Sequence, residues 1–150
     1  MITIRRTDSE NKEFISLVSR LDTELAGRDG ADHVFYAQFN KINMLRQVVV
    51  ARMGKLPVGC GAIKAFDSSA MEVKRMYVMP GFRGQGVASL ILTELEKWAA
   101  ELGFQKCVLE TGLRQPEAIA LYTKSGYNPI PNYGQYAGME NSRCFEKVIG

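Results

Sequence analysis

The sequence predicts a single α+β domain over residues 1–150, in which about four helices flank a central mixed, mostly antiparallel sheet. Hydrophobic spacing passes from the helical to the strand type before the middle of the chain. A turn at residues 53–55 joins two β-rich runs as a hairpin. A glycine-rich loop over residues 80–86 then leads from a strand into a long helix. The expected element order, β-α-α-β-β-β-α-β-α-β-β, is that of one mixed sheet covered by helices.

The first elements are a strand and two helices. Apolar and polar residues alternate over residues 1–6, which predicts a half-buried strand. Asp8 or Ser9 is expected to cap the next helix, because a side-chain oxygen there can accept a first-turn N–H. The apolar stripe of this helix recurs at helical spacing: Phe14, Val18, Leu21 and Leu25. Glycines end it, and residues 31–43 are expected to form a shorter second helix.

The remaining elements are marked by β-rich runs, glycines and prolines. Three β-rich runs precede the glycine-rich loop: residues 47–53, 56–66 and 71–78. The helix after the loop has one apolar side: Val87, Ile91, Leu95, Trp98 and Leu102. Gly103 is its expected stop. The chain is completed by a strand over residues 107–109, a helix from Pro116 to Gly126 and a loop-rich stretch before a final strand over residues 143–149.

The charge balance is too mild for a nucleic-acid surface. The chain has 19 Lys and Arg against 16 Asp and Glu, a net charge of +3, and the two signs are interspersed. The longest apolar runs, residues 48–51 and 88–92, are too short to span a bilayer. The N-terminal segment lacks the apolar core of a signal peptide. We therefore expect a cytoplasmic protein that binds neither nucleic acid nor membrane, while small anionic ligands remain compatible with its charge.

The cysteines and the histidine do not predict a metal site. Cys60, Cys107 and Cys144 lie far apart in apolar stretches, with no C-x-x-C pair and no Cys/His cluster. They are expected to be small buried hydrophobic residues in a reducing compartment. His33, the one histidine of the sequence, lacks the partner pattern of a catalytic base. We expect neither a bound metal nor a cysteine nucleophile.

The loop over residues 79–88, M-P-G-F-R-G-Q-G-V-A, is the most informative segment of the chain. Its glycines let backbone N–H groups approach a ligand, and the helix that follows offers unpaired donors and the positive end of its dipole. Val87 and Ala88 stand where a P-loop has Lys and Ser or Thr, which excludes a P-loop nucleotide site. The glycine order also differs from that of a dinucleotide site. Taken alone, the loop is either an anion site or a tight connection.

Three stretches together resemble the GCN5-related N-acetyltransferase (GNAT) superfamily. Residues 83–88, R-G-Q-G-V-A, are similar to its signature R/Q-x-x-G-x-G/A, which cradles the pyrophosphate of acetyl-CoA. Residues 72–80 resemble the strand before that signature, and residues 115–127 resemble the second motif, A-x-x-L-Y-x-K-x-G-F/Y. The resemblance covers essentially the whole chain. It implies a GNAT-like acyl-CoA N-acyltransferase fold, with acetyl-CoA as cosubstrate.

The resemblance also implies a set of cofactor contacts. Arg83 and the N–H groups of the loop would hold the pyrophosphate, while main-chain groups of the preceding strand would bind pantetheine and thioester. A bulge in that strand would splay it from its neighbour and admit the cofactor. Gln115 departs from the asparagine that many members have. The expected cofactor-binding residues are Met76, Tyr77, Val78, Arg83, Gly84, Gln85, Gly86, Val87, Ala88 and Gln115.

Two residues are expected to move protons. A primary amine with a pKa near ~10.4 is mostly charged at neutral pH, and deprotonating it costs on the order of 4–5 kcal/mol. Glu72 matches a frequent base of the family; the alternative is a solvated carboxylate or an ion pair with Lys74 or Arg75. Tyr122 matches the tyrosine that protonates the leaving CoA thiolate; the alternative is a core tyrosine. Together they would support direct attack in a ternary complex.

The acceptor is less well defined by the sequence. Tyr133, Tyr136 and Glu140 lie in a polar and aromatic stretch and are expected to orient a small amine; the alternative is a surface hairpin that covers a sheet edge. We expect the acceptor to be a small molecule with a primary amine. The alternatives are a protein or peptide amine, and a non-catalytic acyl-CoA-binding module. Members of the family often dimerise, so a homodimer is compatible with the sequence.

Overall fold

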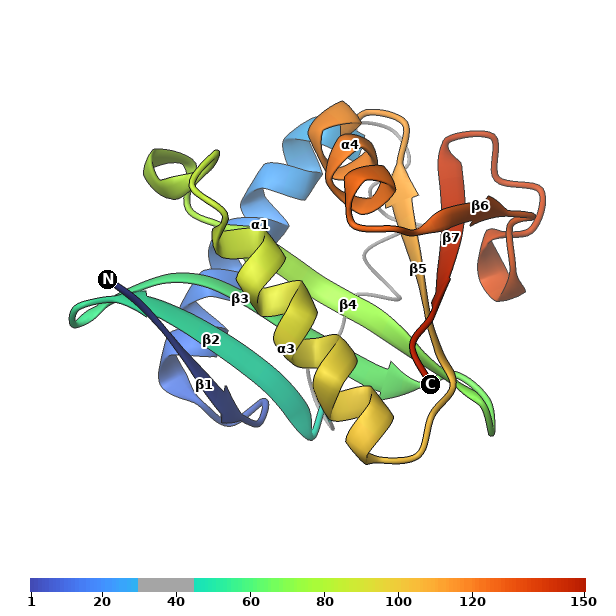
Figure 1. Cartoon of the computed structure of the whole chain (residues 1–150). Coiled ribbons are helices and arrows are strands. Elements are labelled where there is room, and N and C mark those ends of the chain that lie inside the picture. The colour runs from blue at the N-terminus through green and yellow to red at the C-terminus, as the bar shows by residue number, and fades with distance from the viewer. Residues whose placement is uncertain (30–44) are drawn as a thin grey trace.

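A seven-stranded sheet forms the centre of the molecule (Figure 1). The computed structural model describes residues 1–29 and 45–150. Its strands are β1 (Ile2–Thr7), β2 (Gln47–Met53), β3 (Leu56–Ala65), β4 (Ala70–Val78), β5 (Lys106–Gly112), β6 (Asn128–Ile130) and β7 (Ser142–Val148). They lie in the order β1-β2-β3-β4-β5-β7-β6, and the described pairs are antiparallel except β4 with β5. This mixed, mostly antiparallel sheet confirms the fold class predicted from the sequence.

Helices cover both faces of the sheet, with α1 behind it and α3 in front in Figure 1. They are α1 (Lys12–Asp29), α3 (Val87–Glu101) and α4 (Pro116–Lys124), which follows β5. The helix expected over residues 31–43, with His33, lies outside the described residues. Among the helices of residues 1–29 and 45–150, none is both long and apolar enough to cross a membrane.

Two glycines of β3 allow α3 to lie close to the sheet. A Cβ atom built on Gly59 would lie 2.9 Å from Ile91 Cδ1. One built on Gly61 would lie 3.0 Å from both Ile91 Cγ2 and Leu95 Cδ1. Both distances are well inside ordinary carbon–carbon contact, so a larger residue at either position would push the helix outward. Val87, Ile91 and Leu95 are buried and Trp98 packs against the same core, as the predicted apolar side of this helix requires. Leu102 was wrongly included in that side: it follows the last helical residue, Glu101, and is 46% exposed.

The start of α1 differs from the prediction. The helix begins at Lys12, and Asn11 Oδ1 accepts the Phe14 N–H at 2.9 Å, so Asn11 is the capping residue. Asp8 instead accepts the Glu10 N–H at 2.9 Å, in a turn that precedes the helix. The expectation of Asp8 or Ser9 as the cap was wrong because the chain makes this extra turn before the helix begins.

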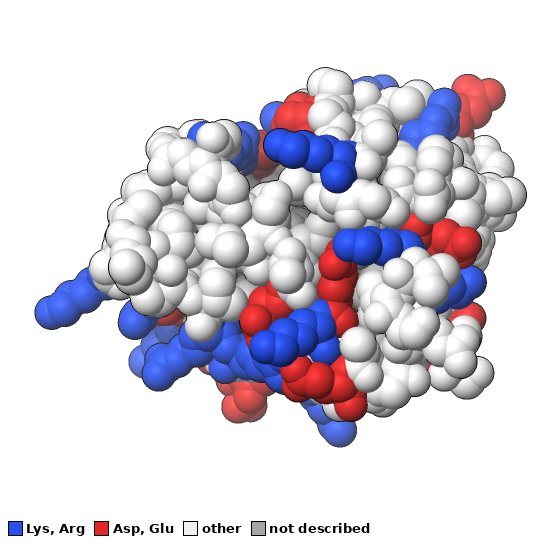
Figure 2. Space-filling view, viewed as in Figure 1, with Lys and Arg blue, Asp and Glu red and all other residues white. Residues whose placement is uncertain are grey.

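Acidic and basic side chains are intermingled in the lower part of the face that carries α3, whereas a broad area at the upper left is uncharged (Figure 2). Arg6 pairs with Glu94 at 2.7 Å and with Glu101 at 2.8 Å. Lys147 of β7 pairs with Glu96 at 2.9 Å. Such partly exposed pairs contribute only about 0–1 kcal/mol each to stability. Their mixed signs give this view of the described residues no broad patch of a single charge.

The cysteines of the chain are free and buried, as the sequence predicts. Burial raises the pKa of the Cys60 and Cys107 thiols to about 12 and that of Cys144 to about 11. These side chains are therefore protonated and unreactive at neutral pH.

A bulge near the end of β4 opens the sheet. Cys60 faces Tyr77 and Ala62 faces Lys74 in the β3–β4 register, so two residues of β4 oppose a single residue of β3. Arg75, one of those two, has a φ of 59°, in the left-handed region. On the other side of β4, pairing with β5 ends where Glu72 meets Val108. Beyond that point the two strands diverge (Figure 1), which confirms the predicted bulge and splay.

Candidate active site

Two adjoining cavities lie where β4 and β5 diverge. The loop cavity, of about 360 Å³, is lined by the end of β4, the glycine-rich loop, the first turn of α3, and residues of α1 and α4. The strand cavity, of about 120 Å³, is lined by residues of β4, β5, α1 and α4, and by Tyr136. Five residues line both cavities: Leu21, Met76, Gln115, Ala118 and Tyr122. The two cavities therefore share one wall.

The glycine-rich loop presents backbone donors to the loop cavity. Gly84 and Gly86 have φ values of 77° and 81°, which glycine adopts without the clash that a Cβ atom would cause. Gly86 is the N-cap of α3, and no side chain there caps the helix within the described part of the chain. The first-turn N–H groups of α3 thus remain available beside the cavity. Such a cradle fits the pyrophosphate of a CoA molecule.

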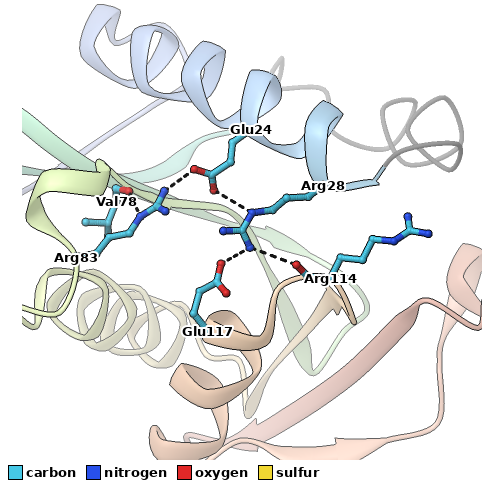
Figure 3. Close-up of polar contacts among 6 residues, drawn as sticks. All are labelled: Glu24, Arg28, Val78, Arg83, Arg114 and Glu117. Carbon is cyan, nitrogen blue, oxygen red and sulfur yellow. Dashed lines mark hydrogen bonds and ion pairs between the residues drawn. The ribbon is translucent and has the colours of Figure 1, made fainter.

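Arg83 projects from the loop into a polar contact with α1 (Figure 3). Its Nε donates to the Val78 carbonyl oxygen at 2.8 Å, and its Nη2 lies 2.8 Å from Glu24 Oε1. The guanidinium also lies over the Tyr77 ring, 5.6 Å from its centroid. The cation expected to meet a phosphate is therefore held at the loop cavity by a carboxylate.

The same ion pair is part of a chain of contacts that crosses from α1 to α4 (Figure 3). Arg28 lies 3.7 Å from Glu24 and forms an ion pair with Glu117 at the start of α4. It also donates to the Arg114 carbonyl oxygen at 3.3 Å. Because Glu24, Arg83 and Glu117 line the loop cavity, this chain of contacts lies along its wall.

Tyr122 lies where the two cavities meet. Its side chain is 6% exposed and packs edge-to-face against Tyr127, with ring centroids 5.8 Å apart. Burial raises the pKa of its hydroxyl above the ordinary value, and the negative charge of Glu110 adds to this shift. The hydroxyl therefore keeps its proton at neutral pH and can serve as a donor.

Glu72 faces the strand cavity and is held by two partners. Its Oε2 accepts a hydrogen bond from the Tyr133 hydroxyl at 2.8 Å, and its Oε1 lies 3.5 Å from Lys74 Nζ. The carboxylate side chain is 11% exposed. The ion pair with Lys74, one of the alternatives left open by the sequence, is present. Arg75 instead pairs with Asp22 of α1.

The tyrosines of the late loop take two different positions. Tyr136 is 3% exposed and lines the strand cavity. Tyr133 packs edge-to-face against Phe66, at 4.8 Å, and against Tyr136, at 5.9 Å, and reaches Glu72 from outside both cavities. Burial raises the pKa of the Tyr133 hydroxyl, with a further contribution from Glu72, so it remains a donor. Glu140 is exposed and lies on neither cavity wall.

The family profile of the acetyltransferase (GNAT) family matches residues 12–127. This chain belongs to the GNAT family. An IAA acetyltransferase of Azospirillum brasilense is 34% identical over 152 aligned residues, covering 99% of this chain and 98% of that protein. As a GNAT enzyme, the protein is an acetyl-CoA-dependent N-acetyltransferase.

Solved structures of GNAT proteins share the fold. A candidate acyl-CoA N-acyltransferase of Klebsiella pneumoniae superposes with a TM-score of 0.84 at 30% identity, covering 100% of this chain and 99% of that one. A GNAT acetyltransferase of Elizabethkingia anophelis with acetyl-CoA bound gives a TM-score of 0.68 at 17% identity, covering 98% and 97%. At that identity the second likeness concerns the fold alone.

Most residues that the sequence singled out for the GNAT cofactor lie together on the loop cavity. They are Met76, Tyr77, Val78, Arg83, Gly84, Gly86, Val87, Ala88 and Gln115. Gln85 does not line it: this side chain is exposed, and its Nε2 lies 3.5 Å from the Gly81 carbonyl oxygen. The residues on both sides of it, Gly84 and Gly86, line the cavity, so the sequence alone does not separate Gln85 from its neighbours.

Sequence reasoning missed two acids and gave Arg75 no role in the site. Glu24 lines the loop cavity, and Arg75 and Glu110 line the strand cavity. Alternation along β5 places Glu110 on the same side as Val108, and that signal could have identified it. No pattern marks Glu24 or Arg75: Glu24 reaches the cavity from another element, and only the bulge turns Arg75 toward it.

Proposed function

We propose that the enzyme acetylates the primary amine of a small molecule, which attacks acetyl-CoA directly in a ternary complex. The observation that carries the proposal is the shared wall: Tyr122 lines both cavities, and Glu72 faces the second of them. A donor beside one cavity and a carboxylate in the other match the two proton transfers of acetyl transfer. We further propose that residues 1–150 act as one catalytic domain.

The loop cavity is the proposed cofactor site. The N–H groups over residues 84–88 and the Arg83 guanidinium would hold the pyrophosphate, after Arg83 exchanges Glu24 for a phosphate oxygen. Main-chain groups of Met76, Tyr77 and Val78 would bind the pantetheine and stabilise the negative charge that develops on the thioester oxygen. Gln115 borders the same space. The bound cofactor supplies an activated acetyl group as a thioester.

Glu72 is the proposed general base. Removing the proton of an ammonium group at neutral pH costs on the order of 4–5 kcal/mol, and a carboxylate beside the amine accepts that proton directly or through a water. The hydrogen bond from Tyr133 at 2.8 Å fixes the orientation of the carboxylate. Tyr133 is thus a positioning residue, and Tyr136 lines the proposed acceptor space.

Tyr122 is the proposed general acid. A free thiol has a pKa of ~8.5, so protonation of the departing thiolate gives moderate assistance. The buried hydroxyl keeps its proton up to high pH, because its pKa is raised by burial. The size of the strand cavity, about 120 Å³, favours a small acceptor over a folded protein surface.

The first test is calorimetric titration with acetyl-CoA, with ADP and NAD as controls, followed by thiol release from a panel of amines. We expect one acetyl-CoA per chain and amine-dependent release of CoA. Tyr122→Phe should lower turnover by roughly 10- to 1000-fold and leave acetyl-CoA binding unchanged. Tyr127→Phe is the matched control, because its hydroxyl donates to Glu96 at 2.9 Å, away from both cavities.

Three results would contradict the proposal. Failure to bind acetyl-CoA above the ADP and NAD controls would remove the loop cavity as the cofactor site. Equal turnover in Tyr122→Phe and Tyr127→Phe would remove Tyr122 as the acid. Acetylation of peptide amines in preference to every small amine would show that the acceptor is a peptide or protein and not a small molecule.

A further inference from the structure

Arg75 is a buried cation beside the strand cavity. It lies at the bulge of β4 with a φ of 59°, a conformation that non-glycine residues rarely adopt. Its side chain is 1% exposed, and the residue lines the strand cavity together with Glu72. Strained backbone persists only where the surrounding structure enforces it, and such residues cluster at active sites and ligand clamps. The position of this guanidinium therefore calls for an explanation beyond packing.

One donor of the guanidinium is left without a partner. Nη2 donates to Asp22 Oδ1, yet Nε, although buried, has no hydrogen-bond partner among the residues that the structure describes. Buried donors are almost always paired, because an unpaired one loses its hydrogen bonds to water and gains none in the protein. Asp22 is 53% exposed, so the counter-charge lies at the solvent side of the buried cation. A second anionic acceptor at Nε would complete the pairing.

We infer that the acceptor carries a carboxylate as well as its amine, and that Arg75 is the residue that binds this carboxylate. The inference rests on the proposed function, because it assigns the strand cavity to the acceptor. Arginine suits this task, since its planar N–H groups match the geometry of a carboxylate. The substrate class is then amino acids, with the amine at Glu72 and the carboxylate at Arg75.

The charges of the cavity agree with a zwitterion. Glu72 and Arg75 are three residues apart on the same strand and line the same cavity, together with Lys74 and Glu110, so charges of both signs border this space. Lys74 is already paired with Glu72, at 3.5 Å, whereas Arg75 Nε is unpaired in the described structure. An amine without an acid group would pair with Glu72 but would leave Arg75 Nε without a hydrogen-bond partner. An amino acid satisfies both residues.

The test compares a small amino acid with its primary amide, in a series that lengthens the carbon chain from glycine to β-alanine and 4-aminobutanoate. CoA release is measured for each pair in the wild type, Arg75→Gln, Arg75→Lys and Asp22→Asn. The acid-to-amide ratio of kcat/KM is compared between proteins, which cancels the different basicities of the two amines. We expect Arg75→Gln to lower this ratio by roughly tenfold or more, mainly through KM of the acid.

The control variants separate recognition from a structural role. Asp22→Asn removes the ion pair to α1 but leaves the guanidinium, so its ratio should stay within about twofold of the wild type. If Arg75 only ties β4 to α1, Arg75→Gln and Asp22→Asn will impair acid and amide equally, which overturns the inference. If Arg75→Gln does not fold, wild-type binding of N-acetylglycine and N-acetylglycinamide in the presence of CoA decides: equal affinities overturn the inference, and tighter binding of the acid supports it.

The same assays distinguish failure of this inference from failure of the proposed function. Acetylation of carboxylate-free amines with an acid-to-amide ratio that Arg75→Gln leaves unchanged overturns the inference alone. Absence of CoA release with every amine, acid or amide, overturns the small-amine proposal and the inference together.

Discussion

The two cavities are built from different parts of the polypeptide. The loop cavity is bordered by the glycine-rich loop and the first turn of α3, where two glycines with positive φ set the course of the main chain. The strand cavity depends on charged side chains of β4 and β5 that the bulge and the splay bring together. A main-chain site binds a group common to all members of a family. A side-chain site can change its ligand by single substitutions.

The largest effect is expected from Glu72→Gln, which removes the proposed base from the strand cavity and leaves the loop cavity intact. Turnover should fall by about 100- to 10,000-fold, while the affinity for acetyl-CoA stays within about twofold. Steady-state kinetics and calorimetry measure the two quantities. Glu146→Gln is the matched control. This carboxylate of β7 pairs with Lys106 of β5 at 3.1 Å, and neither residue lines a cavity. A parallel loss of cofactor affinity would show that the cavities are not separate.

A substitution in the loop should have the opposite pattern. In Gly86→Ala the φ of 81° places a Cβ atom in the left-handed region, at a cost of roughly 1–2 kcal/mol. We expect lower thermal stability and an affinity for acetyl-CoA reduced about tenfold, with the acid-to-amide preference unchanged. Gly27→Ala serves as control, since this helical glycine has open space around it and alanine favours a helix. Unchanged affinity in Gly86→Ala would argue against a main-chain cradle.

Glu24→Gln should strengthen cofactor binding. Glu24 lies 2.8 Å from the Arg83 guanidinium, so it would compete with the pyrophosphate that we propose binds at this site. Removing the negative charge should tighten acetyl-CoA binding by about three- to tenfold at low ionic strength, and less at high salt. Glu13→Gln is the control, because its partner Arg52 lies on β2, away from both cavities. Weaker binding in Glu24→Gln would mean that the carboxylate positions Arg83 for the ligand.

The smallest effect concerns alkaline pH. Burial raises the pKa of Cys60, beneath α1, and of Cys107, beneath α3, to about 12 in the folded chain. An unfolded thiol titrates near ~8.5, so this stabilisation is complete below that pH and is lost as the pH rises toward 12. The melting temperature should therefore begin to fall above about pH 9. Rapid alkylation of both thiols by iodoacetamide at neutral pH would contradict their burial.

The same contrast explains what could be derived from the sequence. Gly84 and Gly86 were identifiable because a glycine pattern encodes backbone geometry directly. Glu72 and Tyr122 were identifiable through their motifs. Arg75 was not, because alternation along a regular strand puts neighbouring residues on opposite faces, and the extra residue of a bulge changes that order.

Long-range partners also could not be derived from local patterns. Tyr133 and Glu72 are 61 residues apart, and their hydrogen bond depends on how the late loop folds over the sheet. The N-cap of α1 moved to Asn11 because a preceding turn was hidden in a polar segment. The order of the described elements along the chain was derived correctly, and so was the burial of Val87, Ile91 and Leu95, since periodicity reports burial. Leu102 was assigned to the same side wrongly, because the helix ends before it.

The close approach of α3 to β3 has a consequence for how this enzyme can diversify. A methyl group added at Gly61 would lie 2.5 Å from Met76 Sδ, and Met76 borders both cavities. A substitution in the core at Gly61 would therefore displace Met76 and change the shape of both cavities. A change in acceptor preference can therefore arise from a core substitution that does not contact the substrate. Such a substitution would lie at the contact between β3 and α3.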